Sequence, residues 1–197
     1  TRLDRIPGVA APRAVALLLP ALDALAALAA KGLYHGNVAP DNVLVGAGDM
    51  TWVTGLGSAA CRPPGSLSRV LLDDEAARFV APEYLDAGSA PAAEDWRGDL
   101  WAAALSLCTV LGAEVTRTDE PAPSVALPPA AATALPDPNA VRALLEACLR
   151  RDPKQRPSSL TAVHDALAVL LTGGAGERFA HAGPPARPAA ADPIAAA

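Results

Sequence analysis

A short polar loop is the clearest candidate for chemistry in this chain. Residues 34–42 read Tyr-His-Gly-Asn-Val-Ala-Pro-Asp-Asn and lead into the apolar residues Val43–Val45. An amide is not basic at neutral pH, so Asn37 can position a hydroxyl group but cannot accept its proton. Asn42 offers one neutral oxygen, which alone is too weak a ligand to hold Mg²⁺. These residue types favour positioning of a bound group over proton transfer or strong metal binding.

Five segments resemble, in order and spacing, the C-terminal lobe (C-lobe) of protein kinases. The loop at 34–45 resembles H-R-D-x-K-x-x-N followed by a strand, and 53–57 stands where the family has D-F-G. Residues 80–83 keep an intact A-P-E, 99–101 resemble the opening of the family's buried helix, and 148–158 match C-L-x-x-D-P-x-x-R-P-[ST]. The pattern H-G-D-x-x-x-x-N is also typical of aminoglycoside and choline kinases, but the A-P-E and D-P-x-x-R-P segments belong to the protein-kinase branch.

The resemblance implies that the catalytic positions are degenerate. Where the family has Asp, Lys and Asp, this chain has Asn37, Ala39 and Gly55. Asn42, a metal ligand in the family, is retained; its alternative role is to brace the loop by hydrogen bonding. No cofactor is expected, and ATP and Mg²⁺ would be bound only if some activity remains.

The residues that hold the family's shape are retained. The resemblance implies that Glu83 pairs with Arg156 and that Asp99 accepts backbone N–H groups from the loop, with His35 packed beneath it. The alternative for Glu83 and Arg156 is a pair of solvated surface charges.

Two serines are candidate phosphorylation sites. Ser66 and Ser68 fall in the segment that corresponds to the activation segment, close to Arg62 and Arg69. The alternative is that both are ordinary polar loop residues.

Composition narrows the function classes. The net charge of −5 and an aromatic content of 4% argue against a nucleic-acid partner, which needs a basic patch or stacking platforms. Three cysteines without C-x-x-C spacing indicate reduced thiols in a cytoplasmic protein. The apolar residues 14–30 are interrupted by Pro20 and Asp23, so no membrane span is expected. High Ala and Pro with few Lys is typical of a high-GC bacterial genome, and we expect a cytoplasmic protein or the cytoplasmic part of a larger membrane-linked one.

Periodicity predicts a mainly α fold (α+β overall) with one or two small β-hairpins. The resemblance implies that residues 1–171 form a protein-kinase-like C-lobe. The opening residues 1–6 resemble the family's helix after the hinge. The N-terminal lobe is expected before Thr1 and so is absent from this chain. Residues 172–197, rich in Gly, Ala and Pro, are predicted to be a flexible tail or linker.

Helices are expected at 14–30, 97–112, 140–150 and 158–171, with a stop at Lys31-Gly32 and an N-cap at Ser158. Pro20 should kink the first helix or mark its first turns. One short strand is expected to begin at Leu33, a second to end at Val45, and a third to cover 52–54. Loops are expected at 55–80 and 113–138.

Selective loss of catalytic groups beside retained shape-holding groups predicts a pseudokinase, a binding or regulatory module with a protein partner. The first alternative is a weakly active or atypical Ser/Thr protein kinase that binds ATP and transfers phosphate to a protein hydroxyl, with Asp41 and Asp49 as the nearest carboxylates. The second is a helical interaction domain unrelated to kinases.

Overall fold

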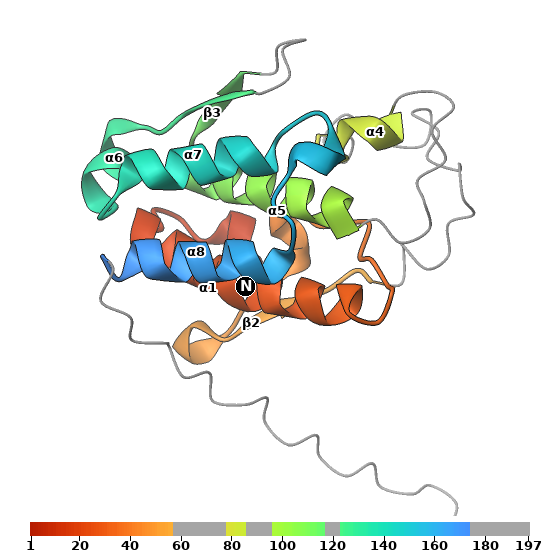
Figure 1. Ribbon diagram of the computed structural model, residues 1–197. Coiled ribbons are helices and arrows are strands. Elements are labelled where there is room, and N and C mark those ends of the chain that lie inside the picture. The colour runs from red at the N-terminus through yellow and green to blue at the C-terminus, as the bar shows by residue number, and fades with distance from the viewer. Residues whose placement is uncertain (57–77, 86–95, 117–122, 174–197) are drawn as a thin grey trace, which may run out of the picture.

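The computed structural model describes residues 1–56, 78–85, 96–116 and 123–173 and is mainly helical, with two small antiparallel hairpins (Figure 1). The longer helices are α1 (Ala11–Ala29), α5 (Trp96–Leu111), α7 (Pro138–Cys148) and α8 (Leu160–Leu171), and the shorter ones are α4 (Pro82–Leu85) and α6 (Pro129–Ala134). The strands are β1 (Val43–Val45), β2 (Thr51–Val53), β3 (Glu114–Thr116) and β4 (Ser124–Ala126). Single 3₁₀ turns are η1 (Leu3–Arg5), η2 (Pro40–Asn42), η3 (Ala47–Asp49) and η5 (Pro153–Gln155).

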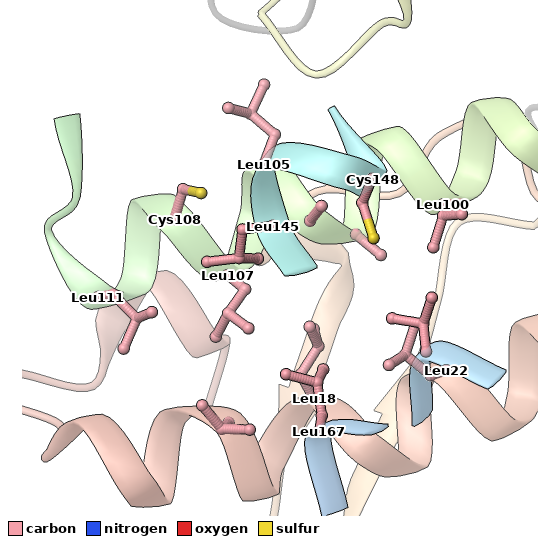
Figure 2. Close-up of a cluster of buried hydrophobic side chains, with 14 of the residues drawn as sticks. Leu18, Leu22, Leu100, Leu105, Leu107, Cys108, Leu111, Leu145, Cys148 and Leu167 are labelled. Carbon is pink, nitrogen blue, oxygen red and sulfur yellow. The ribbon is translucent and has the colours of Figure 1, made fainter. Parts of the chain in front are cut away.

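The core lies where α1, α5, α7 and α8 meet. Figure 1 shows α1 and α8 side by side, with α5 and α7 above them in the view, and each of these pairs of helices contacts the other. Side chains from all four helices interdigitate in Figure 2, among them Leu18, Leu22, Leu100, Leu107, Leu145 and Leu167. α5, which falls on the helix expected at 97–112, is buried without a break from Gly98 to Cys108. Its Ala102-Ala103-Ala104 run allows the close approach that such burial needs.

α1 begins earlier than its apolar stripe predicts and ends where expected. Pro12 lies in the first turn, where its missing N–H group has no partner to lose. Pro20 therefore lies in mid-helix and does not mark the first turns. At the other end Gly32 has φ +67°, and Leu33 N donates to Leu28 O at 3.0 Å, which is the hydrogen bond of a Schellman cap.

α1 is also long and apolar enough to cross a membrane by length and composition alone, a test that core helices pass as well. In the structure, one side of the helix is buried against α5 and α8, as in a core helix; its buried residues include Val15, Leu18, Leu22 and Leu25.

The first hairpin joins β1 to β2 in the register Val43↔Val53, Leu44↔Trp52 and Val45↔Thr51. The start of the chain lies along the other edge of β1, where Thr1 and Val45 exchange backbone hydrogen bonds of 2.7 and 2.8 Å. The expected helix over residues 1–6 is only the single turn η1, because this segment bonds to β1 instead. The strand predicted from Leu33 is also wrong; residues 33–39 form an irregular loop with a bend at Gly36.

The prediction of a loop over 113–138 is wrong for the described parts of this segment, 113–116 and 123–138. They contain the second hairpin, in which Val115 pairs with buried Val125, and then α6. Their high content of Pro and Ala hides the single valine that each short strand directs inward.

The C-terminal helices start one or two residues from their predicted positions. Asp137 caps α7 by accepting a hydrogen bond from Ala140 N at 2.9 Å. Ser159, and not Ser158, caps α8, because its Oγ accepts from Ala162 N at 3.0 Å. The predicted tail falls almost entirely on residues 174–197, which lie outside the described residues, as do Ser66 and Ser68.

Candidate functional site

Asp99 fastens the polar loop to the first turn of α5. Its carboxylate is 3% exposed and accepts two backbone hydrogen bonds, from His35 N at 2.6 Å and from Gly36 N at 2.7 Å. A carboxylate in the first turn of a helix is also stabilised by the helix dipole. Asp99 therefore fixes the backbone immediately before Asn37, which is the contact expected of it.

His35 lies beneath the loop and connects it to the end of β2. Its ring is buried, with Nε2 at 2.9 Å from Thr54 O, and the backbone N–H of Asn37 donates to Nδ1 at 3.2 Å. Since Nδ1 accepts, Nε2 must carry the hydrogen and donate it to Thr54 O. Burial lowers the pKa of His35, which keeps the ring neutral. A neutral imidazole that makes two hydrogen bonds serves as a structural link between the loop and the end of β2.

Asn42, at the end of η2, braces the loop from the other side. Its Nδ2 donates to Asn37 O at 2.8 Å, and its backbone carbonyl accepts from Thr54 N at 2.8 Å and from Thr54 Oγ1 at 3.2 Å. The side chain thus makes the hydrogen bond of a loop brace. Thr54, which sequence reasoning did not single out, bonds to both His35 and Asn42; its only sequence signal is its place directly before Gly55.

The three degenerate positions, Asn37, Ala39 and Gly55, are all at least partly accessible to solvent. Asn37 and Ala39 are half-buried, and Gly55 is exposed, with φ +85°. Among the described residues, no group of three or more His, Cys, Asp or Glu side chains could hold a metal ion. Asp49 is bound to Arg13 by hydrogen bonds of 2.8 and 3.1 Å at the tip of the first hairpin, and Asp41 is a single exposed carboxylate. The described residues around the loop therefore do not fit the Mg²⁺ that the resemblance implies.

A second polar cluster holds α4 against the helices. Arg156 and Glu83 form a bidentate pair, with both N···O distances 2.7 Å, as expected from the sequence. Arg156 also donates to the backbone carbonyls of Arg150, Arg97 and Arg151 at 2.8, 2.9 and 3.2 Å. These bonds use all five N–H donors of the guanidinium group. Because its side chain is fully buried, the alternative of two solvated surface charges is wrong.

Two aromatic contacts that the sequence did not reveal complete this cluster. The guanidinium carbon of Arg156 lies 5.0 Å from the ring centroid of Trp101, a cation–π arrangement. The ring of Tyr84 lies directly on Gly98, where an added Cβ would be 2.2 Å from a ring carbon. The only available signal was a glycine inside an otherwise apolar helix.

Comparison with models of known protein families and with curated proteins finds no match for this chain.

Proposed function

We propose that this chain is a protein-kinase-like C-lobe without phosphotransfer activity, a pseudokinase that acts as a binding or regulatory module. The observation that carries the proposal lies in the polar loop. Asp99, Thr54 and Asn42 hold the loop in place, whereas the positions for chemistry bear an amide (Asn37), a methyl group (Ala39) and a hydrogen atom (Gly55).

Phosphoryl transfer depends on charges that this loop lacks. Catalysis comes from positioning and from neutralising the charge on the transferring group, with cations and a carboxylate beside it. Asn37 can position a hydroxyl group but cannot accept its proton, and loss of such help slows a reaction by about 10²–10⁴. Without a metal, a main source of charge stabilisation is also missing.

The Glu83–Arg156 pair supports the kinase-like assignment over an unrelated helical domain. It joins residues 73 positions apart, which are the two that the A-P-E and D-P-x-x-R-P resemblance designates. The buried α5 beneath the loop supports the same assignment, since Asp99 on α5 bonds to it.

The alternative is a weak or atypical Ser/Thr kinase that uses ATP and Mg²⁺. One observation favours it: Asn42 is retained and its amide is held in a fixed orientation by Asn37 O. If this enzyme exists, Asn42→Ala abolishes its activity.

The test is phosphate incorporation from labelled Mg-ATP into the protein itself and into a generic protein substrate. We expect incorporation equal to that of the Asn42→Ala variant. Incorporation by the unchanged chain that disappears in Asn42→Ala would overturn the proposal and establish the alternative.

Thermal unfolding with ATP, with and without Mg²⁺, tests nucleotide binding separately. A ligand at about 100 times its Kd adds roughly 2.7 kcal/mol to the free energy of unfolding. We expect no shift that depends on Mg²⁺. A shift that requires the cation would contradict the assignment of a metal-free site.

The partner of this module is proposed to be a protein. Trp52 and Leu56 flank Thr54 and Gly55 in the sequence and are 47% and 42% exposed. Large exposed apolar side chains beside a braced loop are a suitable contact for another polypeptide, since aromatic and aliphatic anchors dominate binding energy at interfaces.

A further inference from the structure

His164 lies at the rim of the contact between α1 and α8, the most extensive helix contact among the described residues. Its side chain is 20% exposed, whereas Val163 and Leu167 on the same helix are buried in the core. The two ring nitrogens face carboxylates on different helices. Nδ1 is 3.1 Å from Asp165 Oδ1 on α8 itself, and Nε2 is 3.6 Å from Asp23 Oδ1 on α1. His164 therefore joins the two helices by a polar contact outside the apolar core.

A neutral imidazole cannot satisfy both carboxylates, because it carries only one N–H group. The shorter distance places that hydrogen on Nδ1, which then donates to Asp165. The lone pair of Nε2 is left facing an oxygen of Asp23, which is also an acceptor. When the ring is protonated, both nitrogens are donors, and the contact with Asp23 becomes an attractive ion pair. The protonation of this one ring therefore decides whether α1 and α8 attract each other at this point.

Among the charged residues on the helices that pack against α8, only Asp23 is within ion-pair distance of His164. Arg13, also on α1, pairs with a carboxylate of the first hairpin. On α7, Glu146 accepts a hydrogen bond from the backbone of β4, and Arg142 is exposed. Within the part of the chain that the structure describes, the ring therefore meets two negative charges, one from α1 and one from its own helix, and no positive charge at this distance.

We infer that His164, Asp23 and Asp165 form a pH-sensitive link, which strengthens the contact between α1 and α8 in acid and weakens it as the pH rises. The folded chain holds the ring between two carboxylates and so gains more from its protonation than the unfolded chain does. This contribution to stability is therefore present in acid and is lost toward neutral pH. His35 acts in the opposite direction, because its burial disfavours the charged ring. The inference does not depend on the proposed function.

The test is a double-mutant cycle of Asp23→Asn and His164→Gln, read as thermal midpoints at about pH 5.5 and about pH 8. An ordinary histidine is mostly protonated at the first pH and neutral at the second, while carboxylates are ionised at both. At the lower pH, Asp23→Asn should lower the midpoint by about one to three degrees more in the chain with His164 than in the His164→Gln background. This coupling should vanish at the higher pH, and about 1 M salt should reduce it.

Asp41→Asn is the matched control, because Asp41 is an exposed carboxylate and its replacement changes the net charge of −5 by the same amount. Its effect on the midpoint should be the same with and without His164 at both pH values. The altered side chains all reach solvent, so the variants should fold, and the contribution of His35 is common to them and cancels. Equal coupling at the two pH values, or no coupling at the lower one, would overturn the inference.

Discussion

Two polar clusters meet at the first turn of α5, and they differ in how they use charge. At one, Arg156 and Glu83 form a buried ion pair that also reaches Arg97 O. At the other, the carboxylate of Asp99 accepts backbone N–H groups, and the loop is also held by a neutral imidazole and an amide. In both clusters a charged side chain holds backbone from another segment in place. If the proposed function is correct, the charged groups that hold backbone remain while those that would act on a ligand are absent.

The largest expected effect comes from breaking the ion pair. Arg156→Ala removes every bond of the guanidinium group and leaves Glu83 without its partner, so the free energy of unfolding should fall by about 3–5 kcal/mol. Urea denaturation measures this loss. Arg13→Ala is the matched control, since Arg13 also forms a bidentate pair, with Asp49, but at the surface. We expect little change there; equal losses in the two variants would contradict the contrast between buried and exposed pairs.

A smaller effect is expected at the loop. Asp99→Asn replaces a carboxylate that accepts two N–H groups with an amide that has one acceptor oxygen. The loss of one charge-assisted hydrogen bond should lower the free energy of unfolding by about 1.5–3 kcal/mol. Amide hydrogen exchange at His35 and Gly36 should become faster. If Asp99→Asn is no more destabilising than Asp41→Asn, an exposed control, then Asp99 does not anchor the loop.

The smallest effect is the pH dependence that His35 confers. Its ordinary pKa is 6.5, and burial lowers the pKa in the folded protein. As the pH falls below 6.5, the unfolded chain binds a proton before the folded one does, so the free energy of unfolding declines from there down to the folded pKa and is level above 6.5. Denaturation at a series of pH values should show this slope, and His35→Gln should remove its share. An unchanged slope in that variant would assign the effect to other groups.

The sequence predicts the parts of this fold that repeat a strong pattern. The stripes of α5 and α8 are long enough to define a helix, and Lys31-Gly32 marks a helix end through a conformation that glycine readily adopts. The strand predicted from Leu33 fails for a reason that no periodicity reveals. The backbone N–H groups of His35 and Gly36 bond to Asp99, more than sixty residues away, and not to a neighbouring strand.

The residues of the candidate site also separate into those that the sequence predicted and those that it did not. Asp99, His35, Glu83 and Arg156 were expected from the resemblance, which supplies long-range pairs that composition and spacing cannot. Thr54 and Tyr84 were missed, because the contacts of each depend on how two segments approach in space.

The pairing of α1 with α8 has a consequence for how the chain is made. Residues 11–29 and 160–171 form the most extensive helix contact, so the core closes only after nearly all the intervening chain has been synthesised. Until then α1, which is apolar enough to enter a membrane, lacks the part of its cover that α8 supplies. Contacts between segments so far apart in the sequence slow folding and leave aggregation-prone intermediates exposed. The nascent chain should therefore depend on chaperones that shield α1 until α8 leaves the ribosome.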